Sequence, residues 1–323
     1  MSAAQPDWVD PELATLTRDR FSSAEWLYER KFDGERCLAY RFGGQVALMT
    51  RNRQEVNSTY PELDEALHAQ AGDNFVVDGE VVAFVGRETS FAQLQQRLGQ
   101  RHPDQELRRR VPVYYYLFDV MYADGRDVRE LPLRDRKRIL RDLVTFAGPL
   151  RFATHRNRNG EAYFAQACQW GWEGLIAKRA DAPYRAGRGR DWLKFKCLNG
   201  QEFVIGGYTD PQGSRHGFGA LLLGYYDDKG QLTYAGKVGT GFTEATLASL
   251  HRTLSGLERD QPPFARGRLP KSGVHWVEPK LVGEVGFSEW TTAGELRHPR
   301  YEGLRRDKDP ASVFREKPQG VKP

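Results

Sequence analysis

The sequence changes its pattern near residues 197–200, and this change divides the chain into two parts. Before it, strand-like segments alternate with segments of helical periodicity, which predicts an α+β domain. Beyond it, short apolar segments are separated by Gly, Asp and Pro, with one helical pattern at residues 243–254. Five or so strands and one helix are typical of a small Greek-key barrel, the OB fold. We therefore predict an α+β domain at residues 1–200 and an all-β OB-fold domain at residues 201–323, consistent with single cores rarely exceeding roughly 250 to 300 residues.

The first domain contains the clearest element signals. Residues 26–42 and 45–50 predict two strands joined at Gly43-Gly44, because paired glycines accept the positive φ that a two-residue turn requires. Residues 1–20 carry no clear signal. The remaining predicted elements are strands at residues 75–77, 81–84 and 111–122 and helices at residues 90–100, 133–146 and 161–170.

The composition excludes a protein with membrane-spanning helices. Hydrophobic residues make up 39% and charged residues 28% of the chain, and no segment approaches the roughly 18 apolar residues of a membrane helix. The first residues lack the basic start and apolar run of a signal peptide, so we expect a cytoplasmic protein. The three cysteines, Cys37, Cys168 and Cys197, are far apart and form no C-x-x-C pair, which predicts free thiols.

Positive charge is concentrated locally in the chain. The formal net charge is +5, and arginines cluster at residues 108–110, 185–190 and 305–306. Such clusters bind phosphate backbones in some proteins and are solvated in others. Charge alone therefore leaves a nucleic-acid partner open.

A K-x-D-G-x-R pattern at residues 31–36 is either a solvated charge cluster or part of a reaction centre. Lys194 and Lys196 share one face of a predicted strand because side chains alternate, and ammonium groups about 7 Å apart could clamp a triphosphate. In chain order, the patterns that follow the first are D-G-E at 78–80, L-F-D at 117–119, E-G-x-x-x-K at 173–178 and W-L-K-x-K at 192–196.

In their order, these five patterns resemble those of the covalent nucleotidyltransferases: ATP-dependent DNA ligases, RNA ligases and mRNA-capping guanylyltransferases. The resemblance extends from about residue 26 to 318 and is closest to the ligase domain of bacterial ligase D, through segments such as EFVIGGYTD, YAGKVGTGF and LRHPRYEGLRRDK. It implies an adenylation domain followed by an OB-fold domain, and a DNA ligase that uses ATP with Mg²⁺ or Mn²⁺. AMP would pass from ATP to a lysine and then to a 5′-phosphate, before a 3′-hydroxyl attacks and releases AMP.

The resemblance makes Lys31 the nucleophile. A lysine attacks only after it loses its proton, and we expect the cations of Lys194, Lys196 and the metal ion to lower the pKa of Lys31. Carboxylates suit Mg²⁺, so Glu80 and Glu173 are the expected metal ligands. For the nucleoside, the resemblance implies that Glu29 contacts the adenine amino group, Phe118 stacks on the purine and Glu80 contacts the ribose. It implies that Arg36 contacts the sugar and a phosphate and that Arg51 contacts a phosphate. The pyrophosphate would be oriented by Arg305 (or Arg306), Asp307 and Lys308.

Two positions depart from the ligase pattern. Arg53 stands where ligases commonly carry glycine, a change that bears on the local turn and on the phosphate contact by Arg51. Phe32 replaces the tryptophan that follows the nucleophile in some relatives, a change that we expect to matter little.

The resemblance also indicates partners. We expect nicked or broken double-stranded DNA as substrate, a nucleoid-associated location, the end-binding protein Ku as a partner, and a monomer. Because Lys31 lies near the start of the sequence, we expect no separate DNA-binding domain before the catalytic core. Residues 197–200 are expected to act as a hinge, because the second domain must cover ATP first and DNA later. An RNA ligase or capping-type nucleotidyltransferase, and a non-catalytic DNA-binding module, are the alternatives.

Overall fold

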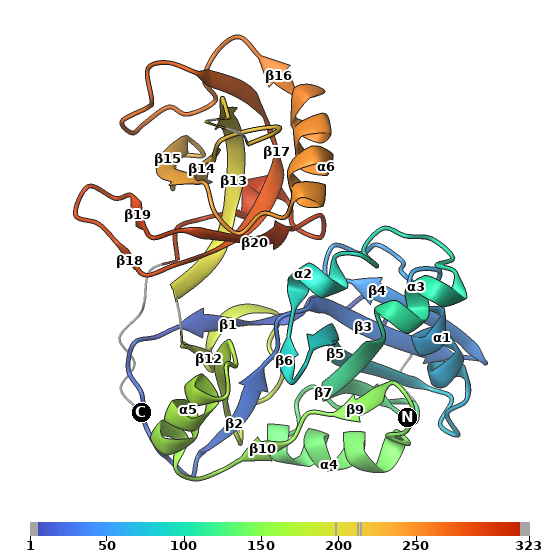
Figure 1. The fold of residues 1–323 in the computed structure, drawn as a ribbon. Helices are drawn as coiled ribbons and strands as arrows, with labels where there is room; N and C mark the ends of the chain where they lie inside the picture. Colours follow the sequence, from blue (N-terminus) through green and yellow to red (C-terminus); the bar gives the residue numbers. More distant parts are fainter. Residues whose placement is uncertain (1–5, 198, 212, 214, 317–323) are drawn as a thin grey trace. The chain divides into compact units, whose positions relative to one another are not determined.

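The computed structural model describes residues 6–197, 199–211, 213 and 215–316. These residues form two compact units, which divide after Cys197. The first unit contains two sheets and several helices, and the second is mostly β (Figure 1). The α+β and mostly-β characters of the two parts agree with the sequence pattern. No helix in the described part of the chain is long and apolar enough to cross a membrane.

One sheet of the first unit joins segments from both ends of that unit. Its central strands are antiparallel, and its edge strand β1 pairs in parallel with β12. In spatial order the strands are β1 (Glu12–Leu16), β12 (Gly187–Lys196), β11 (Gly174–Arg179), β2 (Trp26–Lys31) and β10 (His155–Arg156).

The other sheet of the first unit contains the glycine hairpin. Gly43 and Gly44 both have positive φ, at 56° and 75°, as the predicted turn requires. The strands in spatial order are β4 (Gln45–Thr50), β3 (Glu35–Phe42), β5 (Phe75–Val85), β7 (Val113–Ala123) and β8 (Arg126–Asp127), with β6 (Glu88–Thr89) paired to β5 and β9 (Leu150–Phe152) paired to β7.

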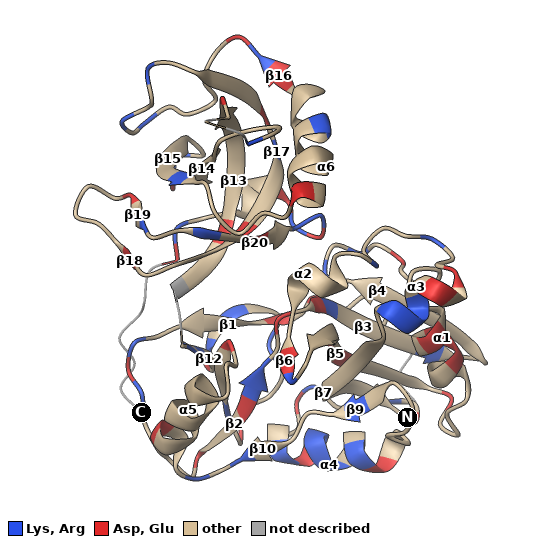
Figure 2. Ribbon diagram, in the orientation of Figure 1, with Lys and Arg blue, Asp and Glu red and all other residues tan. Residues whose placement is uncertain are grey.

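Helices cover the outer faces of these sheets. Apolar residues of α1 (Pro61–His68), α2 (Phe91–Leu94) and α4 (Leu133–Leu143) join the core of the sheet that contains β5 and β7. The helix α5 (Gly160–Gln169) packs Tyr163 and Ala167 against the other sheet. The short helix α3 (Gln105–Arg110) is capped by the side chain of Asp104 and ends in three arginines. Figure 2 shows how charged residues gather on α3 and α4.

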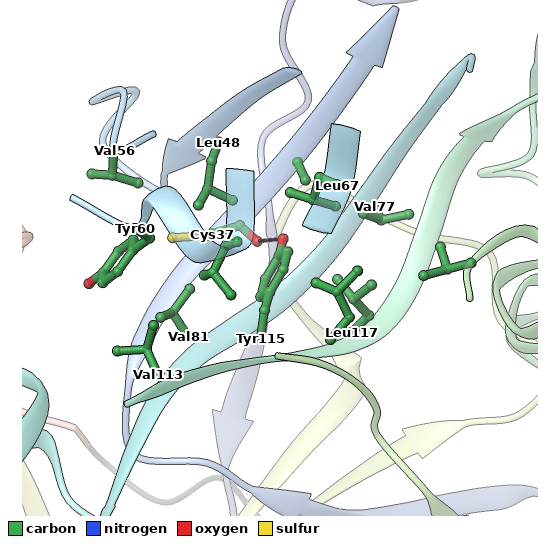
Figure 3. Packing of buried hydrophobic residues seen from close by; sticks show 14 of the residues in the cluster. Cys37, Leu48, Val56, Tyr60, Leu67, Val77, Val81, Val113, Tyr115 and Leu117 are labelled. Atoms are coloured by element: carbon green, nitrogen blue, oxygen red, sulfur yellow. Dashed lines mark hydrogen bonds between the residues drawn. The ribbon is translucent and has the colours of Figure 1, made fainter. Parts of the chain in front are cut away.

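Figure 3 shows the core of the β3–β5–β7 sheet. Cys37, Tyr115 and Leu117 are completely buried there, and the hydroxyl of Tyr115 donates a hydrogen bond of 2.8 Å to the carbonyl oxygen of Cys37. This bond satisfies a polar group that would otherwise be costly to bury. It also ties β3 to β7 across the intervening strand β5.

A further cluster lies between the two sheets. Phe118 of β7 belongs to the same buried cluster as Trp192 of β12, with partly buried Ile176 of β11 packed against it. The inner face of one sheet is thus opposed to the inner face of the other. This arrangement brings residues from the first and last thirds of the unit close together.

The second unit is built on two long, bent strands. β13 and β17 pair along most of their length, with a break in register between Ile205 and Gly207. The elements are β13 (Asn199–Thr209), β14 (Leu221–Tyr226), β15 (Leu232–Val238), α6 (Glu244–Ser255), β16 (Glu258–Arg259), β17 (Val274–Phe287), β18 (Glu289–Trp290), β19 (Leu296–Arg297), β20 (Arg300–Leu304) and the 3₁₀ turn η1 (Pro310–Ser312).

The structure differs from the sequence predictions in several elements. Residues 26–42 form two strands in different sheets, because the chain turns at Phe32-Asp33-Gly34. Residues 75–85 form one continuous strand, and the helix predicted at 90–100 is only the short α2. The sequence patterns gave no prediction for β1, α1 or α3.

The prediction of three free thiols is wrong for two of them. Cys168 and Cys197 form a disulfide, although 29 residues separate them, and Cys37 remains a buried thiol. The fold brings the end of α5 beside the end of β12, with a Cα–Cα distance of 5.3 Å. Spacing along the sequence could not indicate this pairing, because it depends on the packing of α5 against the sheet.

Candidate active site

Three adjacent strands place the charged residues of the sequence patterns on one sheet face. Lys31 of β2 is directly opposite Gly174 of β11, which in turn is opposite Lys196 of β12. Two residues along, Glu29 is opposite Ile176, which is opposite Lys194. Directly opposed residues and residues two apart share a face. Lys31, Glu29, Lys194 and Lys196 therefore share one face, opposite to that covered by α5.

The alternation in β12 follows the sequence prediction. Leu193 and Phe195 are completely buried in the cluster under α5, whereas Lys194 and Lys196 are only partly buried. The two lysines thus lie on the face that carries Lys31.

Glycines of the motifs allow the strands to approach. A Cβ at Gly34 would collide with the carbonyl oxygen of Val81, so the turn after Lys31 can pack against β5 only without a side chain. A Cβ at Gly174 would collide with the carbonyl oxygen of Phe195. These contacts give a physical reason for the glycines in K-x-D-G and E-G.

Glu173 lies between two of the lysines. Its Oε2 is 2.5 Å from Lys31 Nζ, and its Oε1 is 3.8 Å from Lys196 Nζ. The side chains of Lys31 and Glu173 remain 20% and 27% exposed. Burial would raise the pKa of the Glu173 carboxyl, but Lys31 and Lys196 outweigh it and hold that pKa below its ordinary value.

The predicted lowering of the Lys31 pKa is wrong for this structure. Burial and Lys196 would lower that pKa, but the Glu173 carboxylate raises it and prevails. The expected lowering rested on the cations around Lys31. Glu173 was expected to bind a metal ion, so its contact with Lys31 was not anticipated.

Arg36 contacts a buried carboxylate and an aromatic ring of the protein. Its guanidinium forms a two-pronged ion pair with the buried Asp78, with both N–O distances at 2.5 Å, and lies over the Phe118 ring, 4.5 Å from its centroid. Burial would lower the Arg36 pKa, but Asp78 raises it. Tyr184 also donates a hydrogen bond to Asp78. Arg36 is therefore held by the protein itself.

Phe118 is 7% exposed. Lys178 Nζ lies 4.1 Å from the centroid of its ring, and Trp192 packs edge-on at 5.9 Å. The aromatic ring is on the inner face of its sheet, as purine stacking requires, but cations already occupy positions over it.

Glu29 is a buried carboxylate held by two buried lysines. Lys137 Nζ is 2.6 Å from its Oε1 and Lys178 Nζ is 2.8 Å from its Oε2. Burial would raise the pKa of Glu29, but the two lysines outweigh burial and hold that pKa below its ordinary value. The carboxyl group is therefore ionised at neutral pH. Neither lysine was assigned a role from the sequence.

The turn that carries Arg51 contains the residue that departs from the ligase pattern. Arg53 has a φ of 61°, a conformation that favours glycine. Its guanidinium lies 4.9 Å from the centroid of the Trp8 ring and 3.4 Å from Asp10 Oδ1. These contacts help to hold an arginine where glycine would fit more easily. The backbone N–H of Arg51 donates to the carbonyl oxygen of Arg36, so the turn stays next to the motif.

The last predicted group lies in the second unit. Arg305 binds both oxygens of Asp307, at 2.9 Å and 2.8 Å, and approaches Glu284 at 3.3 Å. Lys308 Nζ is 2.7 Å from Glu202 Oε1. Arg306, the alternative to Arg305, is exposed. Arg305 is therefore part of a buried ion pair, and Arg306 is the more accessible of the two.

The two proposed metal ligands lie in the first unit. Glu80 is on β5, directly opposite Arg36 and Tyr116, and is partly exposed. The described residues contain no group of three or more His, Cys, Asp or Glu that could hold a metal ion. Mg²⁺ commonly takes only one or two protein carboxylates together with phosphate oxygens and water, so partly exposed carboxylates suit it.

The sequence matches two parts of one protein family. Residues 11–196 match the ATP dependent DNA ligase domain, and residues 214–308 match the ATP dependent DNA ligase C terminal region. The chain belongs to the ATP-dependent DNA ligase family. The family assignment made from the sequence motifs is confirmed, as is the class of enzyme.

Individual relatives support the closer resemblance to ligase D. The chain is 38% identical to the multifunctional non-homologous end joining protein LigD of Pseudomonas aeruginosa, over 98% of this chain and 38% of that protein. It is 38% identical to the LigD of Mycobacterium tuberculosis H37Rv, over 96% of this chain and 40% of that protein. The chain thus spans about two fifths of these relatives.

Solved structures confirm the fold of this ligase. A mycobacterial DNA ligase D complexed with ATP and MES matches with a TM-score of 0.69 and 36% identity, over 95% of this chain and 98% of that one. The ligase domain of M. tuberculosis LigD matches with a TM-score of 0.50 and 35% identity, over the same shares of the two chains. The ligase consists of a nucleotidyltransferase domain followed by an OB-fold domain, as predicted.

Sequence reasoning missed several buried charged residues of the ligase, among them Lys137, Lys178 and Glu12. Lys137 follows Leu133 by four residues and precedes Leu140 by three, so a lysine on the apolar side of α4 was a detectable signal. Lys178 is the last residue of the E-G-x-x-x-K pattern, but its role was left open. Glu12 lies in the first 20 residues, which gave no signal. Burial raises the pKa of Glu12 to about 7.

Proposed function

We propose that this chain joins a 5′-phosphate to a 3′-hydroxyl in nicked or broken double-stranded DNA, through a covalent AMP on Lys31. The single observation that carries the proposal is the shared sheet face of Lys31, Lys194 and Lys196, with Glu173 between Lys31 and Lys196. This arrangement supports the proposed roles of Lys31 as the nucleophilic amine, Glu173 as its proton acceptor, and Lys194 and Lys196 as phosphate-binding cations.

The first step requires a proton transfer from Lys31. Glu173 raises the pKa of Lys31, so binding of ATP must weaken this ion pair before attack. We propose that the Lys31 proton leaves by way of Glu173 or a water molecule. The Nζ lone pair then forms a bond to the α-phosphorus, the bond from that phosphorus to the bridging oxygen breaks, and pyrophosphate leaves.

Lys194 and Lys196 support this step electrostatically. Their ammonium groups can offset the charge that develops on the α-phosphate and the pyrophosphate. Once Glu173 turns away, the same two cations favour the neutral amine of Lys31. A bound Mg²⁺ or Mn²⁺ held by Glu80 and Glu173 would supply further neutralisation of phosphate charge.

The remaining roles are proposals of the same kind. Glu29 would contact the adenine amino group and Phe118 would stack on the purine in place of one of its present cation contacts. Arg36, Glu80 and Arg51 would contact the sugar or phosphates. We propose residues 1–200 as the adenylation domain and residues 201–323 as the OB-fold domain. In the OB-fold domain, the pyrophosphate would be oriented by Arg305 or Arg306, Asp307 and Lys308. A hinge is proposed near residues 197–200, of which residue 198 lies outside the described residues.

The biological setting follows from the relatives by analogy. Two of them are named as non-homologous end joining proteins, so we propose DNA end joining in the cytoplasm, with Ku as a partner and the chain acting as a monomer. Sealing of blunt-ended and of nicked DNA, with and without Ku, tests this setting. Unchanged blunt-end sealing in the presence of Ku would remove the partner from the proposal.

Labelling with ATP tests the chemistry directly. Incubation with α-labelled ATP and Mg²⁺ is expected to give one covalent AMP per chain, and Lys31→Ala is expected to give none. Equal labelling of both proteins would end the proposal. Sealing of nicked DNA and of nicked RNA, each measured with ATP and with GTP, distinguishes a DNA ligase from an RNA ligase or a capping-type enzyme. Tight binding to nicks without sealing would indicate a non-catalytic module.

A further inference from the structure

The ammonium group of Lys137 is fully used by the protein. It lies 2.6 Å from Glu29 Oε1, 3.0 Å from the carbonyl oxygen of Ala153 and 3.3 Å from that of Phe118. An ammonium has three N–H donors, so these acceptors leave none for a ligand. The side chain is 3% exposed. Lys137 therefore links α4 to β2 and β7 and cannot itself touch a nucleotide.

Lys178, the second lysine that contacts Glu29, differs from Lys137 in its hydrogen bonding. It is 2.8 Å from Glu29 Oε2, and its side chain is 2% exposed. Apart from this ion pair, no hydrogen-bond partner of its Nζ is found among the described residues. The ammonium lies over two rings, 4.1 Å from the centroid of Phe118 and 3.9 Å from that of Trp192. The N–H donors that do not face Glu29 therefore lie beside Phe118, where a bound base is proposed to stack.

Glu29 and Lys178 together present an acceptor next to a donor. A carboxylate oxygen has more than one acceptor site, so each Glu29 oxygen can still accept a hydrogen bond beside its lysine. Adenine has an amino group at position 6, whereas guanine has a carbonyl oxygen there. A fixed, ionised Glu29 would attract the amino group and repel the carbonyl.

We propose that Lys137 is a positioning residue for base selection: it fixes Glu29 through Oε1 so that the carboxylate accepts from the adenine amino group and rejects guanine. The proposal rests on the proposed function, in which Glu29 contacts adenine. A free Glu29 side chain could rotate away from a guanine carbonyl, and selection would then weaken. The three bonds of Lys137 prevent this, since they tie the carboxylate to the backbone of two other segments.

The test compares Lys31 adenylation with ATP, GTP and purine riboside triphosphate, which lacks a group at position 6. In Lys137→Met we expect the ratio of ATP to GTP rates at subsaturating nucleotide to fall by roughly tenfold or more, through a higher KM for ATP. The rate with purine riboside triphosphate should change less. Lys137→Arg, which keeps a charged donor, should restore part of the ratio.

Arg138→Ala is the matched control, because Arg138 is the next residue of α4 and its side chain is 72% exposed. This variant should keep the wild-type ratio. If Lys137→Met does not fold, Lys137→Gln, which retains two donors for the carbonyl oxygens but no charge, takes its place. An equal loss of rate with all three nucleotides would overturn the proposal and leave Lys137 a structural residue. Absence of AMP transfer in the wild-type protein would instead overturn the proposed function.

Discussion

Lys31 Nζ and Glu173 Oε2 lie 2.5 Å apart, where the last residue of β2 pairs with the first residue of β11. The residue proposed as nucleophile is thus neutralised by the residue proposed as metal ligand. This contact raises the pKa of Lys31 and lowers that of Glu173. The ion pair therefore favours the protonated form of Lys31.

Glu173→Gln should make Lys31 more reactive toward small acylating reagents. Removal of the carboxylate leaves burial and the Lys196 cation, both of which lower the pKa of Lys31. The midpoint of its pH-dependent acylation, followed by mass spectrometry without nucleotide, should fall to a lower pH than in the wild type. The exposed Lys271 serves as the internal reference. An unchanged Lys31 midpoint would show that Glu173 does not control this proton.

Glu12→Gln should stabilise the ligase at alkaline pH. Glu12 is 1% exposed, and its Oε1 has no hydrogen-bond partner among the described residues. Burial raises its pKa from 4.5 to about 7. A raised carboxyl pKa means that the folded state favours the proton, so stability falls as the pH rises from about 4.5 through about 7.

Urea unfolding at several pH values checks this expectation. The difference in unfolding free energy between Glu12→Gln and wild type should grow by about 2 to 3 kcal/mol between pH 4.5 and pH 8.5. Glu25→Gln, at an exposed position, should show no such trend. A constant difference across this range would mean that Glu12 titrates normally in the folded protein.

The sequence predicted best those features that depend on residues close together along the chain. The W-L-K-x-K pattern placed Lys194 and Lys196 correctly on one face of a strand, because alternation within a strand is a local property. The Glu29–Lys137 contact was not predictable in this way, because 108 residues separate the partners and only the docking of α4 joins them. The disulfide was missed for the same reason. The protonation of Lys31 was misjudged because it depends on a distance of a few ångströms between two strands.

The buried pair of Arg136 and Asp119 should behave as a single unit. Both side chains are completely buried, with Nε–Oδ1 at 2.7 Å and Nη2–Oδ2 at 3.0 Å. Asp119→Ala leaves a buried guanidinium without its anion, and we expect it to lower the unfolding free energy by about 3 to 5 kcal/mol. Adding Arg136→Met should cause little further loss, as urea unfolding of the single and double variants can measure. Additive losses would show that the two charges act independently.

The disulfide between Cys168 and Cys197 should make stability depend on reductant. It closes a loop between residues separated by 29 positions, and the cross-link restricts the unfolded chain, which is worth about 3 to 4 kcal/mol for a loop of this size. The backbone N–H of Cys197 also donates to the carbonyl oxygen of Glu173, so the same corner supports the carboxylate beside Lys31. Reduction with a dithiol should therefore lower the unfolding free energy of the wild-type ligase by this amount.

Cys168→Ser should be insensitive to the same treatment. Without reductant its unfolding free energy should match that of the reduced wild type, because both lack the cross-link. Alkylation of the denatured wild-type chain should modify only Cys37 before reduction and all three cysteines afterwards. Modification of three thiols in protein that was never reduced would contradict the disulfide and restore the expectation of free thiols.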